Sequence, residues 1–316
     1  MNRLPAEWER QRALLISYPH SQSDWGYCIE EVKEFYNEFI DIVKKYQNLI
    51  ILSEEDLDIK TSKSHFEVKV VKVKTNDTWV RDYGPISVQT SKSDFELKDF
   101  IFNGWGLKYP ANYDNVVNRE VFNTKKIGFV LEGGSIDSNG DGVLLTTSKC
   151  LLEKNRNPHL SKEEIEKKLK NFFGLKKVLW LNSGFLAGDD TDSHIDMLAR
   201  FVAKNTIVYT RCDDKDDIHY DELKKMEKEI KEFGYKSVPL PWVGAKYYKD
   251  ERLPASYANF VIINGAVIVP VYNDSNDKEA LKILKKLFPD RDVISLDASV
   301  LIREHGSIHC SCMNIF

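Results

Sequence analysis

The stretch SKEEIEKKLKNFFGLKKVLWL, residues 161–181, predicts a helix that is followed at once by a short apolar strand. Ser161 is a suitable N-cap, Glu164 stands three residues later as in a capping box, and Gly174 ends the helix. Two more segments repeat this pattern, YDELKKMEKEIKEFG before SVPLP and NDKEALKILKKLF before DVISL. The three helices begin roughly 60 residues apart, which indicates a repeated unit.

Pairs of extended segments belong to the same unit. FVLEGGSID precedes GVLLTT, and ANFVIIN precedes AVIVPVY with Asn264-Gly265 between them, which is a strong hairpin signal. A strand–strand–helix–strand unit of about 60 residues would fit about five times into the chain of 316 residues. Because no linker rich in Pro, Gly or Ser and no low-complexity stretch divides the sequence, we expect one α/β domain over residues 1–316.

The composition argues against several classes of protein. The net charge of −4 is unlike that of a nucleic-acid-binding surface, which needs a clustered basic excess. No apolar run approaches the roughly 18 residues of a membrane span, and the N-terminus lacks the apolar region of a signal peptide. An odd number of cysteines at irregular spacing indicates reduced thiols in a cytoplasm. The five cysteines are Cys28, Cys150, Cys212, Cys310 and Cys312.

The C-terminal segment REHGSIHCSCMN, residues 303–314, contains the first candidate for chemistry. Cys310 follows a Gly-Ser turn, and residues 308–315 read as a short strand that would carry this thiol at its start. In such a strand Cys312 would share a face with Cys310. Most cysteines are small buried hydrophobic residues. We keep that interpretation for Cys312, because no second Cys or His pair stands at zinc spacing.

A second candidate is the acidic segment GDDTDSHID, residues 188–196. Four acids and a histidine in nine residues are too polar for a core segment, although a solvated loop or a cation site remains an alternative. The spacing lacks the alternating ligands and the distal Glu of a calcium loop. If residues 194–200 run as extended chain, His194 and Asp196 point the same way and face one ligand.

Two shorter motifs complete the set. TNDTWVRDYGP contains Trp79 and Asp82 in a predicted strand that ends at Gly-Pro, and Glu132 precedes two glycines. Gly-Gly lets another group approach the backbone closely, although each motif alone could be a turn and nothing more. Together the motifs supply one thiol, one imidazole and three carboxylates, which are the groups that hydrolysis of a guanidinium needs.

Eight segments resemble, in this order, the agmatine deiminase family of guanidino-modifying enzymes, which belongs to the pentein superfamily alongside the bacterial-type peptidylarginine deiminases. They are PAEWERQRALLISYPH, TNDTWVRDYGP, NGWGLKYP, LEGGSID, LLEKNRNP, GDDTDSHIDMLARF, LPASYANF and HGSIHC. The resemblance runs from residue 5 to the C-terminus, so it covers essentially the whole chain. It implies a five-bladed α/β propeller of about five ββαβ units, which agrees with the repeat above, and a reaction without metal or organic cofactor. Residues 304–307 depart from the Gly-rich run that is usual there.

The same resemblance implies roles for five residues. Cys310 is the nucleophile and His194 the acid/base, with Glu132 as the carboxylate partner of that histidine. Asp82 and Asp196 hold the guanidinium. Elementary chemistry agrees, because a guanidinium keeps its proton in proteins and presents a planar fork of donors. Two carboxylates can bind that fork through charge-assisted hydrogen bonds and so hold its central carbon for attack.

The implied substrate is agmatine, which carries a guanidinium at one end and an ammonium at the other. Asp190 is our candidate for the ammonium, with Asp189 and Asp192 as alternatives. Trp79 would line the aliphatic channel or stack on a cation. Arginine would instead need a cation for its carboxylate. We discount Arg81 for that role, because in a strand it points away from the acid that follows it.

Four other functions stay open. The same site could deiminate arginine or peptidyl-arginine, or transfer an amidino group to an amine. A non-catalytic propeller could serve as a binding module, although a binding module has no need of all five residues. A cysteine protease is the fourth, although the extra acids would be unfavourable around a developing oxyanion. For the setting we expect a cytoplasmic homodimer that acts in putrescine and polyamine synthesis.

Overall fold

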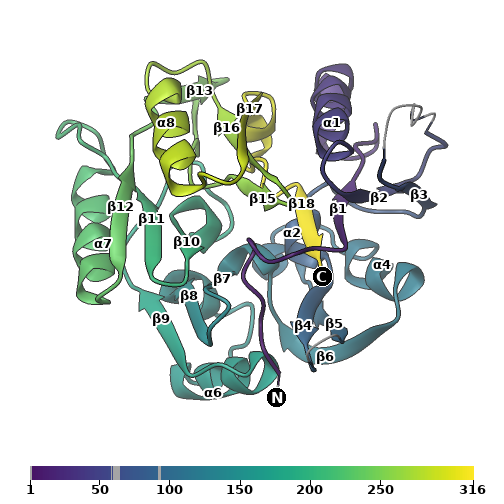
Figure 1. The fold of residues 1–316 in the computed structure, drawn as a ribbon, viewed down its shortest axis with the longest axis horizontal. Helices are drawn as coiled ribbons and strands as arrows, with labels where there is room; N and C mark the ends of the chain where they lie inside the picture. The colour runs from purple at the N-terminus through teal and green to yellow at the C-terminus, as the bar shows by residue number, and fades with distance from the viewer. Residues whose placement is uncertain (1, 58, 60–64, 92–93) are drawn as a thin grey trace.

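A computed structural model of the chain describes residues 2–57, 59, 65–91 and 94–316. Within these ranges strands and helices alternate, and the sheets follow one another around the view in Figure 1. Five sheets share one plan, in which an antiparallel pair of strands is extended on one side by a parallel strand. The predicted α/β class is therefore confirmed.

Four of the five sheets are built from consecutive parts of the chain. They are β4-β5-β6 (Ile86–Gln89, Phe95–Ile101, Thr124–Val130), β7-β8-β9 (Ile136–Ser138, Val143–Thr147, Lys177–Leu181), β10-β11-β12 (Ala199–Ala203, Thr206–Thr210, Lys236–Leu240) and β15-β16-β17 (Val261–Ile263, Ala266–Val271, Asp292–Asp297). The fifth has the order β18-β1-β2-β3 (Cys312–Ile315, Ala13–Ser17, Asn48–Ser53, Val68–Lys72). A separate hairpin pairs β13 (Lys246–Tyr248) with β14 (Glu251–Leu253). Because β18 pairs with β1, one sheet joins the two ends of the chain.

A helix connects the two parallel strands in each sheet. These helices are α1 (Ile29–Val43), α4 (Asp114–Val121), α6 (Lys162–Phe173), α7 (Tyr220–Glu232) and α8 (Asp277–Leu287). Three shorter helices lie in loops, α2 (Val80–Tyr83), α3 (Gly104–Leu107) and α5 (Ser148–Leu151). The three helices and following strands that the sequence predicted are all present, so the repeated strand–strand–helix–strand unit is confirmed.

Local signals fix the ends of these elements. The Ser161 hydroxyl accepts from the Glu164 amide at 3.3 Å, and the Glu164 carboxylate accepts from the Ser161 amide at 2.8 Å. Gly174 ends α6 in the left-handed conformation with φ 66°. In the predicted hairpin between β15 and β16, Gly265 has φ 80°. Each of these predictions from the sequence is therefore confirmed.

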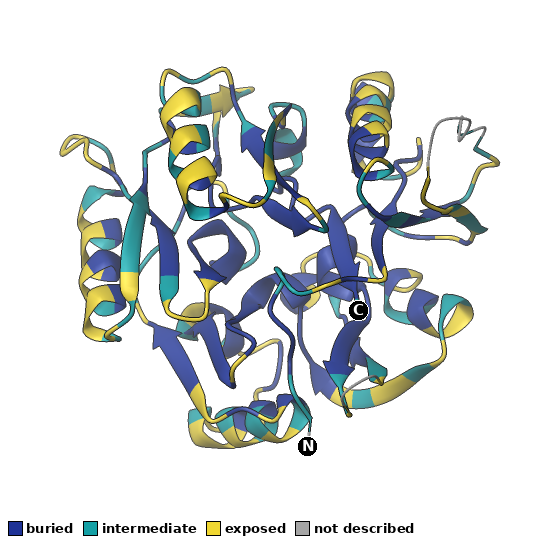
Figure 2. Ribbon diagram, in the orientation of Figure 1, coloured by how far each residue is buried: buried dark blue, intermediate teal, exposed yellow. Residues whose placement is uncertain are grey.

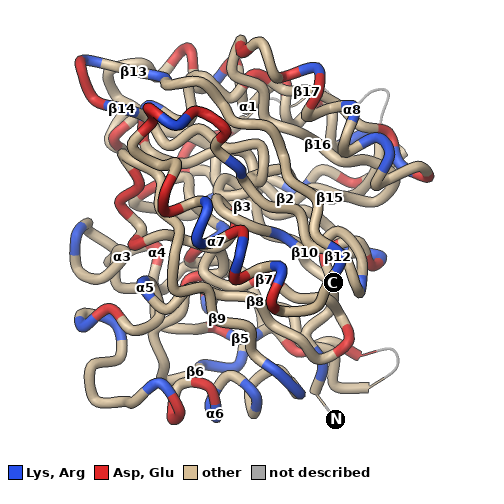
Figure 3. The backbone as a smooth tube through the Cα atoms, turned by 90° about the vertical axis from the view of Figure 1, so that its left-hand side faces the viewer, with Lys and Arg blue, Asp and Glu red and all other residues tan. Residues whose placement is uncertain are grey.

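Figure 2 shows that the strands are mostly buried, whereas the helices expose their outer faces. Lys and Arg are interspersed with Asp and Glu along these outer faces in Figure 3. On α7, for example, Lys225 pairs with Glu222 and Lys231 pairs with Glu227. Among the described residues, none of the helices combines the length and the apolar character that crossing a membrane requires.

The N-terminal segment ties several units together. The Arg3 amide donates to the Gln89 carbonyl at the end of β4, and the Leu4 amide donates to Phe173 at the end of α6. The Arg12 amide donates to Ile315 in β18. Pro5 and Ala6, which follow these contacts, are buried, whereas residues 7–9 are half-buried.

Candidate active site

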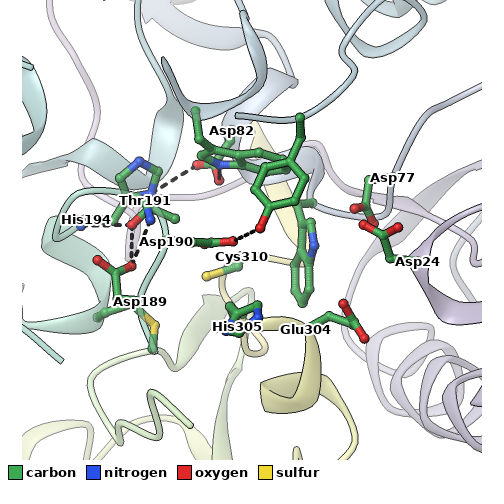
Figure 4. A pocket seen from close by; sticks show the side chains of 15 residues that line it. Asp24, Asp77, Asp82, Asp189, Asp190, Thr191, His194, Glu304, His305 and Cys310 are labelled. Atoms are coloured by element: carbon green, nitrogen blue, oxygen red, sulfur yellow. Dashed lines mark hydrogen bonds and ion pairs between the residues drawn. The ribbon is translucent and has the colours of Figure 1, made fainter. Parts of the chain in front are cut away.

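A cavity opens beside the turn that carries Cys310 (Figure 4). Six of its lining residues are acids, and none of the described residues that line it is Lys or Arg. The acids lie on both sides of the thiol in Figure 4, with Asp24, Asp77 and Glu304 on one side and Asp189 on the other. The lining is Asp24, Asp77, Trp79, Asp82, Trp105, Tyr109, Asp189, Asp190, Thr191, His194, Met197, Glu304, His305, Gly306 and Cys310.

Cys310 lies in a turn and not in a strand. Residues 308–311 form this turn, and β18 begins only at Cys312, so the prediction of a strand from residue 308 is wrong. The physical reason is Asn259, whose side-chain oxygen accepts from the amides of His309 and Cys310 at 2.9 and 3.3 Å. The Asn259 amide nitrogen donates to the Cys310 sulfur at 3.2 Å. The turn therefore presents the thiol at the cavity wall.

Gly306 is required by the ring of Trp79. A β-carbon at position 306 would lie 2.3 Å from a ring carbon of Trp79, so only glycine fits beneath the indole. Trp79 packs in turn on Trp25, with ring centroids 5.6 Å apart. It lines the cavity as predicted, although the strand predicted for this motif is instead the short helix α2.

Three predicted residues converge on one glycine. A β-carbon on Gly134 would lie 2.7 Å from an Asp82 oxygen, 2.7 Å from His194 Nδ1 and 3.1 Å from Asp196 Oδ2. The Gly134 amide donates to Asp82 at 2.9 Å, and Trp105 Nε1 donates to the other oxygen of Asp82 at 2.9 Å. The Glu-Gly-Gly motif is thus explained by close approach of these side chains to the backbone.

His194 and Asp196 both reach this point, but by a different route from the predicted one. Residues Ile195–Met197 form a 3-10 turn, so the extended chain expected from residue 194 is wrong, and β10 begins only at Ala199. Asp196 Oδ2 lies 3.7 Å from the Cys310 sulfur. The Asp196 Oδ1 atom is buried and has no partner among the described residues.

Burial sets the protonation behaviour of the group. It raises the pKa of Asp82 to about 6, although His194 works against it. Burial raises the pKa of the Cys310 thiol well above its usual value, and the Asp196 and Asp82 carboxylates add to this effect. Burial alone would lower the pKa of His194, but Asp82 and other acidic neighbours raise it well above its usual value. These shifts favour a neutral Cys310 thiol and a His194 imidazolium when no substrate is bound.

Glu132 lies behind His194 and does not line the cavity. Both its oxygens accept from Nε of Arg156, at 2.9 and 3.0 Å, and both side chains are fully buried. Ligand atoms of Glu132, Cys150 and His194 lie within 4.8 Å of one another, which is compact enough to ask whether they hold a metal. The Arg156 guanidinium, which pairs with Glu132, would repel a divalent cation at this position. We therefore assign no metal to the cluster.

The three candidate acids for an ammonium differ in their environments. Asp190 lines the cavity, accepts from the Tyr109 hydroxyl at 2.7 Å, and has its pKa raised by burial. Asp189 also lines the cavity, but its oxygens accept from Thr191 and from the Ser193 amide. Asp192 lies outside the lining and pairs with Arg156 and Lys108. Asp190 is thus the acid of the three that is most open to a ligand.

Sequence reasoning missed four contributors to the site. Asn259, Trp105 and Tyr109 lie in SYANF and NGWGLKYP, which were noted only as parts of the resemblance. Their polar atoms meet the site through folding, and no local pattern marks them. The fourth is His309, whose Nδ1 lies 2.7 Å from Asp196 Oδ2.

The chain is similar to proteins of known classes over nearly its whole length. Residues 3–315 match the sequence model of the Porphyromonas-type peptidyl-arginine deiminases. A structure of C. jejuni agmatine deiminase with substrate bound has 45% identity and a TM-score of 0.96, covering 100% of this chain and 96% of that one. An agmatine deiminase of Medicago truncatula is 32% identical, over 97% of this chain and 94% of its own length.

A more distant likeness concerns the fold alone. A dimethylarginine dimethylaminohydrolase adduct has 15% identity and a TM-score of 0.58, covering 96% of this chain and all of that one. The resemblance noted from the sequence segments is therefore confirmed at two levels, in sequence and in fold.

Proposed function

The chain belongs to the family of Porphyromonas-type peptidyl-arginine deiminases, and from this premise we propose that it hydrolyses agmatine to N-carbamoylputrescine and ammonia. The observation that carries the proposal is a cavity with a thiol, two imidazoles and six acids, in which the described lining offers no Lys or Arg. Such a cavity selects a ligand with positive charge at both ends. The names of the C. jejuni and Medicago relatives support the same substrate.

We also infer the architecture that holds this site. The five sheets of common plan would be the blades of one five-bladed α/β propeller, and residues 1–316 would form a single catalytic domain. The pairing of β18 with β1 supports this view, because it joins the first and last units. The cytoplasmic location, the homodimer and the part in putrescine synthesis remain predictions.

In the proposed complex Asp82 and Asp196 hold the guanidinium. Asp196 offers the buried Oδ1 atom that lacks a partner among the described residues. Asp82 accepts from Gly134 and Trp105, and these donors fix the orientation of its carboxylate. Two oriented carboxylates hold the planar cation by charge-assisted hydrogen bonds, with its central carbon beside the thiol.

The first half of the reaction forms a covalent intermediate. The Cys310 thiolate attacks the guanidinium carbon and forms a C–S bond. His194, as the imidazolium, gives a proton to one terminal nitrogen, and the C–N bond breaks with release of ammonia. A thiouronium remains on Cys310, so one difficult displacement becomes two easier steps.

The second half consumes water. His194, now neutral, takes a proton from a water molecule that attacks the same carbon. The C–S bond breaks as the newly attached oxygen gives up its second proton to solvent, where the released ammonia takes it up. The ureido product leaves neutral, and the thiolate is regenerated together with the imidazolium. Glu132 would steady the imidazolium from behind, as its buried position next to His194 suggests.

The substrate itself completes the electrostatics. When no substrate is bound, burial raises the pKa of the Cys310 thiol, and the Asp196 and Asp82 carboxylates raise it further. A bound guanidinium cancels the charge of these acids and favours the thiolate. We therefore expect slow alkylation of Cys310 in the free enzyme and a preference for cationic amidine reagents. Equal rates for neutral and amidine reagents of similar reactivity would contradict this.

Arginine fits the cavity less well than agmatine. Its carboxylate would meet Asp190 in place of a cation. The Arg81 guanidinium faces away from the cavity, because it donates to the His309 carbonyl and to the Asn314 side chain. These contacts support discounting Arg81 as a partner for that carboxylate, although Arg81 makes them from helix α2 and not from the predicted strand.

The direct test measures ammonia and ureido product from agmatine, L-arginine and a blocked peptidyl-arginine, with Cys310→Ser as the inactive control. We expect turnover of agmatine alone and its loss in the variant. Turnover of arginine or the peptide instead would keep the chemistry and refute the assigned substrate. No turnover of any of the three would refute the proposed hydrolysis.

A further inference from the structure

The proposed mechanism gives no role to the N-terminal motif PAEWE. Its Glu7 lies in a second cavity that shares no lining residue with the catalytic one. His309, Arg81 and Asp137 line this second cavity as well. Although 302 residues separate them in the sequence, Glu7 Oε2 lies 2.8 Å from His309 Nε2. Glu7 thus lies against His309, the residue that precedes the nucleophile.

His309 bridges two carboxylates. Its Nδ1 atom lies 2.7 Å from Asp196 Oδ2, and its Nε2 atom lies 2.8 Å from Glu7 Oε2. Ionised carboxylates only accept hydrogen bonds, so a ring that lies between two of them is placed to donate to each from one of its nitrogens. Burial works against ionisation of both acids, yet the pKa of Glu7 is held well below its usual value by Arg200 and His309, and that of Asp196 is lowered by His309.

A further cation anchors this pair. Arg200 is fully buried and donates to Glu7 Oε2 at 2.6 Å and to Asp137 at 2.8 Å. Glu7 also accepts from the Ile262 amide at 2.6 Å. Glu7 is therefore fixed by three donors from different parts of the chain, and it can hold the imidazole ring in one orientation.

The bridge fixes the orientation of Asp196, a fully buried residue beside Cys310 that is not among the described residues lining the catalytic cavity. His309 occupies Oδ2, the oxygen that lies 3.7 Å from the Cys310 sulfur, and leaves Oδ1 without a partner among the described residues. We propose that the Glu7–His309 pair is a positioning device, which aims the free oxygen of Asp196 at the guanidinium and offsets its charge beside the thiol. This inference rests on the proposed function, because it assigns Asp196 to the substrate.

A purely structural role would tie the N-terminal segment to the core without affecting the thiol. The two roles differ in the pH dependence of Cys310. The charged groups around this thiol are Asp196 and Asp82, with His194 on the same cavity wall. Those around His309 are Asp196 and Glu7, with Arg200 and Arg81 behind them. Removing the His309 ring takes away the partner of Asp196 Oδ2, so more of the negative charge of Asp196 acts on the thiol and disfavours the thiolate.

The test compares His309→Asn and Glu7→Gln with His159→Asn, a control at an exposed histidine. Alkylation of Cys310 by iodoacetamide is followed from pH 6 to 10 in the absence of substrate. For His309→Asn we expect the rate at pH 8 to fall about tenfold and the profile to move to higher pH by about one unit, as for loss of one nearby charge. Glu7→Gln should move the pH profile of alkylation in the same direction but by a smaller amount, and the profile of the His159→Asn control should match that of the unaltered protein.

A second arm measures agmatine binding by calorimetry in the Cys310→Ser background. We expect the Kd to rise about tenfold with His309→Asn, because the hydrogen bond that holds the Asp196 carboxylate in its orientation is lost. Unchanged alkylation profiles and an unchanged Kd in variants that remain folded by circular dichroism would overturn the proposal. If His309→Asn does not fold, the isosteric Glu7→Gln decides by the same criteria. Failure of the unaltered protein to turn over agmatine would contradict the proposed function, while the alkylation comparison would still stand.

Discussion

The two sides of the Cys310 turn hold buried acids in opposite electrostatic settings. On the cavity side burial raises the pKa of Asp82 to about 6 and that of Asp77 to about 7. Behind the turn the pKa of Glu7 is lowered despite burial, because Arg200 and His309 lie against it. Asp196 lies between the two regions, beside the thiol, and its pKa is lowered despite burial by His309. The difference is not the depth of burial but how far neighbouring cations outweigh it, since His194 does not outweigh burial at Asp82, whereas Arg200 and His309 do so at Glu7. The negative charge on the cavity side is left for a ligand to neutralise. Behind the turn, the charge of Glu7 is neutralised by Arg200 and His309, and we call these three residues the rear network.

This contrast assigns different costs to the two regions. Buried carboxylates without a cation oppose folding, and proteins keep such groups where function requires them. A buried ion-pair network is costly to break, because the remaining partner stays buried and unpaired. Changes on the cavity side should therefore affect activity first, and changes in the rear network should affect stability first.

The largest expected effect is on the cavity side. Asp82→Asn should lower kcat/KM for agmatine about 10³-fold, or about 4 kcal/mol, because the guanidinium loses an ionised partner. The free energy of unfolding at pH 7 should change by no more than about 1 kcal/mol, the value of one hydrogen bond. Ammonia release and urea unfolding measure the two quantities. If Asp82→Asn lowered the unfolding free energy by several kcal/mol, the two regions would not differ in the way we expect.

Arg200→Met should give the opposite pattern. The arginine is fully buried and paired with Glu7 and Asp137, so its removal should cost about 3 kcal/mol of unfolding free energy. Any fall in kcat/KM of the folded protein should be smaller than that of Asp82→Asn, since no atom of Arg200 lines the cavity. Chemical denaturation followed by kinetics on the folded fraction checks both. If the Arg200→Met variant were as stable as the unaltered protein, the pairing of Arg200 with Glu7 and Asp137 would contribute little to the unfolding free energy.

Two acids that line different parts of the cavity provide a sharper comparison within it. Asp190→Asn should raise KM for agmatine about 30-fold with little change in kcat, about 2 kcal/mol for a lost partner of the distal ammonium. Asp24→Asn, across the cavity in Figure 4, is the matched control and should leave KM nearly unchanged. Steady-state kinetics decide between them, and a reversed pattern would move the ammonium to the Asp24 side.

The raised pKa of Asp82 also predicts a proton balance. In the unfolded chain the carboxyl has a pKa near 3.9, and in the folded chain burial raises it to about 6. The folded state therefore binds the proton more tightly, so this carboxyl should make the unfolding free energy fall as pH rises from about 4 to 6. Agmatine should release protons on binding to Cys310→Ser at pH 6. Calorimetry in two buffers measures this release, and Asp82→Asn should reduce it.

The sequence predicted the elements whose signals are local. The α6 capping box, the Gly265 turn and the repeated helices could be found because neighbouring residues determine them. Three short segments could not. Residues 80–83, 195–197 and 308–311 turn where an extended chain was expected, because groups distant in sequence hold them, as Asn259 holds the last.

The site shows the same division between local and distant causes. Residue types and the resemblance indicated Cys310, His194, Asp82 and Asp196, and folding brings all four together. The links behind them carry no pattern, since Glu7 and His309 lie at opposite ends of the chain. A carboxylate's partner cannot be read from its own segment, and so the sequence could not separate Asp190 from Asp192.

The smallest expected effect lies outside both regions and calibrates them. Ser161 caps α6 through its hydroxyl, and Ser161→Ala should lower the unfolding free energy by about 1 kcal/mol. Because neither Ser161 nor Glu164 belongs to either cavity, kcat/KM should stay unchanged. Urea unfolding and ammonia release again measure both. A fall in activity here would mean that small losses of stability alone affect the site, and the specific effects expected at Asp82 and Asp190 would then need correction for that loss.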